Sequence, residues 1–272
     1  MATALITGAS SGLGEEFAWQ LAAAGRDLVL VARSGDRLHE LAHNLTEATD
    51  VRVEVLVADL ATGEALARVA QRVAAGATGG EPSNTSFDND CAATGTAPID
   101  LLINNAGYGL PAGILATDVE QEVAALDVMV KSVLVLSHTA AHAMTARGRG
   151  AILNVASVAA WLGNSSYAAH KAWVTSFTES LASQLRGTGV SATAVLPGLT
   201  HTEFHERARL GHYESLPAIA WLDAEHVVAS ALAAVRRKQV LVTPSVRYAA
   251  VTSVVRTLPR SWVRAASRRH RT

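Results

Sequence analysis

Short apolar, β-branched segments alternate with longer amphipathic segments along most of the chain, and this alternation limits the folds open to it. Unbroken runs of Val, Ile and Leu predict buried strands, and apolar residues recurring every three or four positions predict helices. The predicted strands cover residues 3–8, 27–33, 51–60, 99–107, 150–157, 190–198 and 239–245. The pattern predicts an α/β fold of Rossmann type, a doubly wound parallel sheet of about seven strands with helices on both faces. Ligands of such sheets bind beyond the carboxyl ends of the strands.

One stretch interrupts the alternation. Residues 76–97 are rich in Gly, Ser, Thr and Asn and show no periodicity. We predict a flexible surface insertion here, between a helix and a strand of one catalytic domain that spans residues 1–272.

The positive charge is concentrated at the C-terminal end. No Asp or Glu follows Glu225, whereas Lys238 and nine arginines do, although the whole chain has a net charge of −1. The basic tail, residues 246–272, has two interpretations. It is a solvated, partly frayed C-terminus, or it uses apolar residues such as Trp262 to touch an anionic membrane or an acidic partner. Pro259 argues against one uninterrupted helix here.

Several classes of protein are disfavoured by the composition. Because 49% of the residues are hydrophobic, a disordered chain is excluded. The first predicted strand begins too early to leave room for a signal peptide, and no apolar run reaches the roughly 20 residues of a membrane span. The single cysteine, Cys91, cannot form an internal disulfide, which fits a reducing cytoplasm. We expect a cytoplasmic protein with no nucleic-acid partner.

The segment TGASSGLG, residues 7–14, joins the first predicted strand to the first predicted helix. In this context Gly8 permits a tight turn, Gly12 lets the backbone approach a pyrophosphate, and Gly14 lets helix and strand pack closely. The helix N-terminus adds free N–H groups and the positive end of the helix dipole. The predicted phosphate-binding turn comprises Gly8, Ser10, Ser11, Gly12, Leu13 and Gly14.

Three further motifs follow in order: NNAG at residues 104–107, Ser157 in NVASVAA, and YAAHK at residues 167–171. Together with the Gly-x-x-x-Gly-x-Gly turn, they make the chain resemble the short-chain dehydrogenase/reductase family, in its subclass of about 250 residues. The resemblance extends from Thr3 to about Ser245. It implies a nicotinamide cofactor, interconversion of a carbonyl and a secondary alcohol, and a homo-oligomer, dimer or tetramer, formed through two long helices.

The resemblance assigns the catalytic roles to Ser157, Tyr167 and Lys171. Tyr167 is expected to exchange a proton with the substrate oxygen, and Ser157 to hydrogen-bond that oxygen. Lys171 lies one helical turn from Tyr167, where a cation favours the phenolate, so we expect it to lower the pKa of Tyr167. The resemblance also implies that Lys171 holds the nicotinamide ribose.

Two features depart from the family pattern. Ser157 and Tyr167 are only ten residues apart, which shortens the loop over the substrate site. The family motif Asp-x-Asn in the long helix becomes Asp127-Val128-Met129, and a Met side chain cannot donate a hydrogen bond to a proton-relay water. We hypothesise that the enzyme is active but not optimised. A large drop in turnover of Met129→Asn would instead reveal a positive role for Met129.

The end of the second predicted strand indicates the cofactor. NAD enzymes usually place an acid there, whereas this chain has Ala32 and Arg33, and Arg pairs well with a 2′-phosphate. We therefore expect NADP(H), with NAD less favoured. The resemblance places further cofactor contacts at Asp59, Leu60, Asn105, Ala106, Gly107, Tyr167, Lys171, Pro197, Gly198, Thr200 and Thr202.

Histidines do not change this interpretation. His138 and His142 have the i, i+4 spacing of a zinc pair but no obvious third ligand, so no metal site is predicted. His201 and His205 fall in the segment that the resemblance makes a substrate-facing lid, and we interpret them as surface residues.

The leading hypothesis is an NADP-dependent oxidoreductase acting on a small, moderately apolar carbonyl compound or alcohol. A non-catalytic NADP-binding sensor on the same fold is the alternative, supported only by Met129 and the short loop.

Overall fold

The computed structural model describes residues 2–75, 97–110, 114–201, 220–259 and 261–263. They form a seven-stranded parallel sheet with the order β3-β2-β1-β4-β5-β6-β7, so the predicted doubly wound fold is confirmed. The strands are β1 (Thr3–Thr7), β2 (Asp27–Ala32), β3 (Val53–Val57), β4 (Ile99–Asn104), β5 (Gly150–Val155), β6 (Val190–Val195) and β7 (Leu241–Val242).

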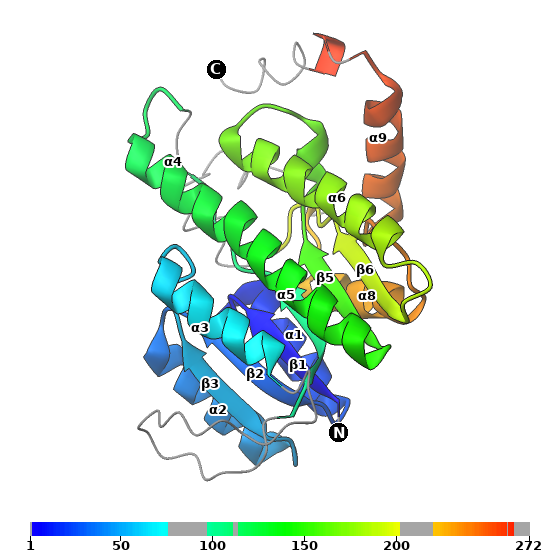
Figure 1. Ribbon diagram of the computed structural model, residues 1–272. Helices are drawn as coiled ribbons and strands as arrows, with labels where there is room; N and C mark the ends of the chain where they lie inside the picture. The colour runs from blue at the N-terminus through cyan, green and yellow to red at the C-terminus, as the bar shows by residue number, and fades with distance from the viewer. Residues whose placement is uncertain (1, 76–96, 111–113, 202–219, 260, 264–272) are drawn as a thin grey trace.

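Helices cover both faces of the sheet (Figure 1). One face packs against α1 (Gly12–Ala23), α2 (Gly35–Ala48) and α8 (Ala224–Arg236), and the other against α3 (Gly63–Ala74), α5 (Ser132–Arg147) and α6 (Ser166–Gln184). Successive strand residues enter opposite layers: Ile6 of β1 packs with Phe17 of α1, whereas Leu5 packs in the layer of Leu136 from α5. The continuous apolar strand runs follow from this two-sided burial.

The long helix predicted over residues 119–147 has three parts. They are α4 (Val119–Leu126), a π-helical turn η1 (Asp127–Lys131) and α5. Its length and composition alone would let it cross a membrane, but Met129, Leu136, Ala140 and Met144 are fully buried in the core. It is therefore a core helix of this fold.

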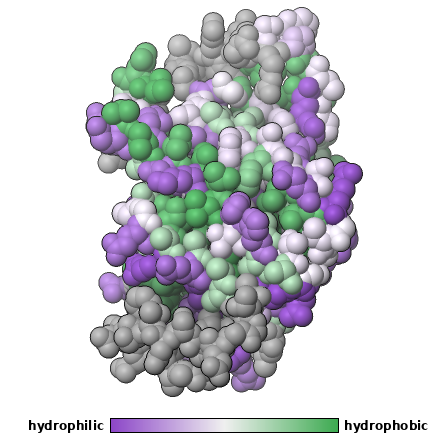
Figure 2. Space-filling view, in the orientation of Figure 1, coloured by the Kyte–Doolittle hydropathy of each residue, from purple (hydrophilic) through white to green (hydrophobic). Residues whose placement is uncertain are grey.

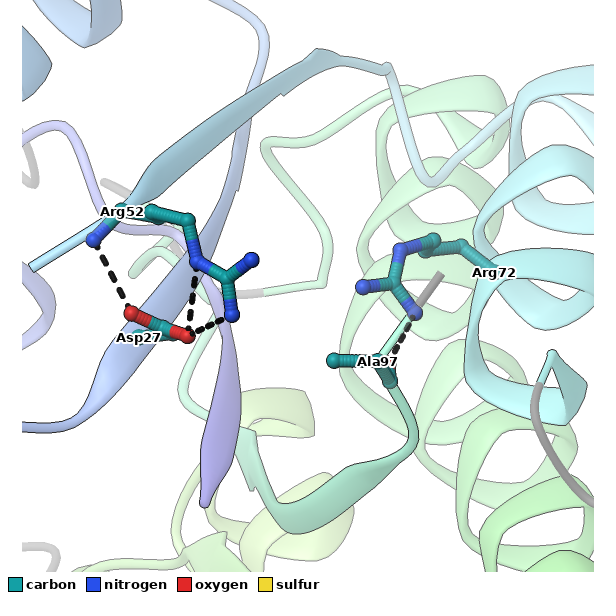
Figure 3. Close-up of polar contacts among 4 residues, drawn as sticks. All are labelled: Asp27, Arg52, Arg72 and Ala97. Carbon is teal, nitrogen blue, oxygen red and sulfur yellow. Dashed lines mark hydrogen bonds and ion pairs between the residues drawn. The ribbon is translucent and has the colours of Figure 1, made fainter. Parts of the chain in front are cut away.

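Two arginines secure the sheet at the end where β2 and β3 begin and where the chain enters β4 (Figure 3). The Arg52 guanidinium donates to Asp27 Oδ2 at 2.6 and 3.1 Å, and the Arg52 backbone N–H donates to Asp27 Oδ1 at 2.9 Å. Burial alone would raise the pKa of Asp27, but the hydrogen bonds and charge of Arg52 outweigh it and lower that pKa. Arg72 of α3 donates to the Ala97 carbonyl at 3.2 Å, just before β4. The rest of the predicted insertion, residues 76–96, lies outside the described residues.

The basic tail begins as a helix, α9 (Val246–Thr257), that packs on the protein. The Tyr248 hydroxyl donates to the Ala220 carbonyl at 2.7 Å and accepts from the Leu199 N–H at 3.2 Å. The Tyr248 ring also fills the space beside Gly198. A frayed terminus is thus the wrong description for this part of the tail, whereas residues 264–272 are outside the described part of the chain.

Candidate active site

The predicted site residues gather at one edge of the sheet. Because the strands are parallel, Gly8 after β1, Asn105 after β4, Ser157 after β5 and Pro197 after β6 all lie at the carboxyl edge. This is the edge where sheets of this kind bind their ligands.

The turn between β1 and α1 needs glycine for two reasons: positive φ angles and close backbone contacts. Gly8 and Gly12 have positive φ angles of 67° and 58°, which side chains disfavour. A Cβ atom on Gly8 would lie 2.8 Å from the Ala106 Cα, and one on Gly14 would overlap the Gly8 carbonyl. The sequence therefore keeps β1, α1 and the turn after β4 in close backbone contact.

Thr7 and Asn105 hold these two turns together. The Thr7 hydroxyl accepts from the N–H groups of Asn105 and Ala106 at 3.0 and 3.1 Å. The Asn105 amide donates to the carbonyls of Thr7 and Gly8 at 3.0 and 3.1 Å. The Asn105 side chain is therefore committed to bracing the glycine turn, and Thr7 is a positioning residue that the sequence analysis missed.

The start of α1 has the donors that an anionic group needs. Its first backbone N–H groups have no partners within the helix, and the Ser11 side chain does not cap them. Ser10 and Ser11 are partly exposed, whereas Leu13 packs against the core. Glycine backbone, free N–H groups and the positive dipole end together fit the pyrophosphate of a dinucleotide.

Charged groups flank the predicted adenine end of the site. Arg33 follows β2 and is exposed. Asp59 Oδ1 accepts from the Ala61 N–H at 3.0 Å, and the Leu60 side chain is buried in the core. Burial raises the pKa of Tyr108, while the positive charge of Arg33 opposes this rise. Tyr108 thus lies within electrostatic reach of Arg33, and the sequence analysis did not single it out.

The predicted catalytic side chains meet at the end of β5. The Tyr167 and Ser157 side chains are hydrogen-bonded to each other. Ser157 Oγ also accepts from the Ala159 N–H at 3.1 Å, and so caps the 3-10 turn η2 (Val158–Trp161). Lys171 Nζ donates to the Val155 carbonyl at 2.7 Å and lies 5.7 Å from the centre of the Tyr167 ring. The end of β5 therefore positions Ser157, and helix α6 positions Tyr167 and Lys171.

Without a bound cofactor, burial is the main cause of the pKa shifts of Tyr167 and Lys171. It raises the pKa of Tyr167 to about 12, although the hydrogen bond with Ser157 acts in the opposite direction. It lowers the pKa of Lys171 to about 8. The expected lowering of the Tyr167 pKa by Lys171 is not what this geometry gives, because burial of the phenol raises that pKa and only the hydrogen bond with Ser157 acts against the rise.

Comparisons with known proteins agree with this geometry. The family model described as short chain dehydrogenase matches residues 2–79 and 89–212. The chain belongs to the short-chain dehydrogenase family. It is an oxidoreductase of the kind that acts on alcohol and carbonyl groups.

Individual relatives cover most of the chain. Sulfoacetaldehyde reductase 2 from Chromohalobacter salexigens is 34% identical over 205 residues, 74% of this chain and 73% of that protein. A short-chain dehydrogenase from Sphingobium yanoikuyae, solved in complex with NADPH, has a TM-score of 0.79 at 32% identity and 94% coverage of both chains. The bulky-bulky ketone specific alcohol dehydrogenase from Comamonas testosteroni has a TM-score of 0.75 at 28% identity and 95% coverage of both chains.

Met129 and Lys171, the predicted catalytic lysine of this short-chain dehydrogenase, both lie near Gly107. Met129 is fully buried in the π-helical turn η1. A Cβ atom on Gly107 would lie 3.4 Å from Met129 Sδ and 3.5 Å from Lys171 Nζ, so both groups face the same glycine. The surroundings of the amine thus include a thioether, which accepts hydrogen bonds only weakly.

The turn after β6 supplies the remaining predicted contacts. Pro197 and Thr200 are buried, and the Thr200 hydroxyl donates to the Gly198 carbonyl at 3.1 Å. Thr202 and His205 lie outside the described residues. His201 is exposed and stacks on Trp221, with 4.8 Å between ring centres.

His138 and His142 do not form part of the site. Both are exposed on α5, and their rings lie 4.5 Å apart. In the described part of the dehydrogenase, no three His, Cys, Asp or Glu side chains gather as a metal site requires.

Proposed function

We propose that the protein is an NADP-dependent oxidoreductase that interconverts a carbonyl and a secondary alcohol, with Tyr167 as the acid/base. The observation that carries this proposal is the hydrogen-bonded pair of Ser157 and Tyr167 beside Lys171, at the edge of the sheet that also holds the glycine turn. The NADPH complex of the Sphingobium relative and the ketone specificity named for the Comamonas enzyme support it.

The proton chemistry falls to Tyr167 and Ser157. Nicotinamide supplies or accepts the hydride when the cofactor is bound. With a pKa of about 12, Tyr167 is fully protonated at neutral pH and ready to donate to the substrate oxygen. An alkoxide is a stronger base than a phenolate, so this donation is downhill as carbonyl reduction proceeds. The Ser157 hydroxyl stabilises the negative charge that develops on the same oxygen.

Lys171 has an electrostatic and a positioning role in this proposal. Its bond to the Val155 carbonyl fixes the amine at the end of β5. When charged, the amine stabilises the phenolate that remains after Tyr167 has given up its proton. The glycine turn and the first N–H groups of α1 would hold the pyrophosphate, and Asn105 would keep that turn in shape.

The first experiment measures NADPH consumption by the wild type with a panel of ketones and aldehydes. Tyr167→Phe is expected to lose at least about 100-fold in turnover, because general acid catalysis by a positioned side chain has about this value. NADPH affinity should fall far less than turnover, because the change removes one hydroxyl group among many predicted cofactor contacts and leaves the aromatic ring in place. NADPH binding with no turnover on any substrate, unaffected by the Tyr167 change, would instead favour the NADP-binding sensor.

The preference for NADP is proposed from Arg33. It is the exposed residue directly after β2, where its guanidinium can pair with a 2′-phosphate and where NAD enzymes usually carry an acid instead. Arg33→Ala should weaken NADPH binding by at least about 10-fold and leave NADH binding unchanged. Arg237→Ala, which removes an exposed arginine at the end of α8, is the matched control.

The substrate is proposed to be a small, moderately apolar carbonyl compound or alcohol. The turn that follows Ser157 presents partly buried Val158, Trp161 and Leu162, which offer apolar contact and no charge of their own. A panel of ketones that increase in apolar surface tests this proposal, with kcat/KM expected to rise along the series.

We further propose a cytoplasmic homo-oligomer. Apolar residues remain exposed along α4 and α5, and this surface lies on the long helix that the family resemblance assigns to oligomer contacts. Burial of this surface between copies would remove it from water.

A further inference from the structure

Helix α9 has two faces that differ in their surroundings. Its inner face contacts the protein through Tyr248, the buried Thr252 and Arg256, whose guanidinium lies 4.7 Å from the centre of the Trp161 ring. Its outer face carries Val246, Val251 and Val254, which are 87%, 60% and 59% exposed. The outer face therefore leaves three valines in contact with water, which is more apolar surface than a solvated helix face usually carries.

Two further exposed apolar residues follow the helix in the chain. Leu258 is partly exposed, and Trp262 is 67% exposed. We use the term outer apolar strip for Val246, Val251, Val254, Leu258 and Trp262. The strip lies in a segment that contains only basic charged residues, because no Asp or Glu follows Glu225.

We propose that the outer apolar strip docks on an anionic membrane surface. Valine and leucine side chains with one tryptophan suit the boundary between headgroups and acyl chains, and arginines suit anionic headgroups. The charged residues of this segment of the sequence are all basic, and positive charge adds electrostatic attraction to such a surface.

Helix α4 also has exposed apolar residues, and its charge differs from that of α9. This difference indicates whether each surface fits a membrane or a second copy of the chain. Val119 and Val123 are also exposed, but they share their helix with Glu120 and Glu122. Anionic lipid would repel that surface, whereas a second copy of the chain could cover it. The outer apolar strip has no such acids, so lipid is the occupant that its charge fits.

Docking in this way would bring the catalytic edge close to the membrane. The inner face of α9 holds the turn after β6 through Tyr248 and packs on η2, the turn after Ser157, where Arg256 lies over Trp161. Ketones or alcohols dissolved in the bilayer are then the substrates nearest to Tyr167. This consequence rests on the proposed oxidoreductase function, whereas docking itself does not.

The test is co-sedimentation of the full chain with vesicles. We expect binding to vesicles made of equal parts of phosphatidylcholine and phosphatidylglycerol, and at least about 10-fold weaker binding to phosphatidylcholine alone. Salt on the order of 0.5 M should weaken binding by screening the charges. The double variant Val251→Ser with Val254→Ser should lose at least about 10-fold in affinity, because both side chains are exposed and the fold does not need them. Val57→Ser, which changes an exposed valine of β3, should bind like the wild type.

Two results would overturn the proposal. One is equal binding to the neutral and the anionic vesicles, or to neither. The other is an unchanged affinity of the Val251→Ser and Val254→Ser double variant. Because sedimentation needs no turnover, these results are independent of the proposed function.

An activity measurement then tests the consequence for the substrate. With anionic vesicles present, kcat/KM for a long-chain ketone should rise several-fold in the wild type and not in the double variant. Both proteins should reduce a water-soluble ketone equally. Absence of turnover on every ketone would contradict the proposed function and leave the docking result standing.

Discussion

At Gly14 the absence of a side chain sets the geometry of the cofactor turn. A Cβ atom there would overlap the Gly8 carbonyl and lie 2.6 Å from Asn105 Nδ2, and neither group can move without opening the turn. We expect Gly14→Ala to weaken NADPH binding by at least about 10-fold and to destabilise the fold by about 1–3 kcal/mol, the range for overpacking.

Gly63 provides the matched control for Gly14→Ala. It is the first residue of α3, and no atom lies within 4 Å of the position that its Cβ would take. Gly63→Ala should therefore be neutral or slightly stabilising, because alanine reduces the entropy of the unfolded chain. NADPH titration and urea unfolding of both variants check the pair. Equal effects of the two changes would contradict the steric argument.

Lys171 makes stability depend on pH. Its pKa falls from 10.5 to about 8 on folding, so the unfolded chain holds this proton more tightly. The stability contribution of Lys171 is therefore present in full above pH about 10.5 and is lost as the pH falls through about 8. Relative to Lys171→Met, the wild type should gain on the order of 3 kcal/mol between these two pH values.

Urea unfolding of the wild type and Lys171→Met across this pH range checks the prediction. The slope with pH is the decisive quantity, since the variant also loses the hydrogen bond to Val155 at every pH. Tyr167 is present in both proteins, so its own titration cancels in the comparison to first order. A stability difference that does not change with pH would contradict the prediction.

The sequence indicated which side chains lie together at the carboxyl edge of the sheet, but not their electrostatics. Gly8 was identifiable from the pattern of the turn, and the pairing of Tyr167 with Lys171 from helical spacing, because both are local properties, whereas Ser157 and the catalytic roles were assigned by the family resemblance. The rise of the Tyr167 pKa could not be predicted in this way, because it depends on burial by residues that are distant in the sequence. The role of Asn105 also depends on distant residues. Its side-chain amide donates to the carbonyls of Thr7 and Gly8, which precede it by about a hundred residues.

At the level of elements, α9 shows what a composition-based prediction misses. The basic tail was predicted from its charge, whereas one of the contacts that dock it is the Tyr248 hydroxyl, which bonds to Ala220 and Leu199. These partners precede Tyr248 by 28 and 49 residues, and no periodicity in the sequence reports such a contact. The π-helical turn in the long helix was missed for a similar reason, since Met129 and its neighbours fit an ordinary helical pattern.

Tyr248→Phe tests how much this hydroxyl holds α9. The change keeps the ring beside Gly198 but leaves the Leu199 N–H and the Ala220 carbonyl without this partner. We expect the free energy of unfolding to fall by about 1–3 kcal/mol, the cost of unsatisfied polar groups. Urea unfolding measures it. Tyr108→Phe is the control, because the Tyr108 hydroxyl makes no hydrogen bond to the described residues, and an equal loss there would contradict the argument.

At the scale of the whole molecule, two exposed apolar surfaces differ in charge. Figure 2 shows hydrophobic side chains over α4 at the upper left and across the middle of this face. The residues of α4 that contribute to this surface include Val119, Val123 and Leu126. Acidic residues accompany this surface, whereas only basic charges accompany the outer apolar strip of α9. One molecule can therefore contact a second copy and a membrane through separate surfaces.

This separation predicts two independent sets of variants. Val119→Ser with Val123→Ser should lower the molecular mass seen by sedimentation, because the change removes apolar contact area from the proposed interface between copies. Val251→Ser with Val254→Ser should leave that mass unchanged, since those residues lie on α9. A monomeric wild type, or a mass that falls with the α9 variant instead of the α4 variant, would contradict the assignment. Because both pairs exchange exposed valines for serine, a difference between them reports where the surface lies and not a general loss of hydrophobicity.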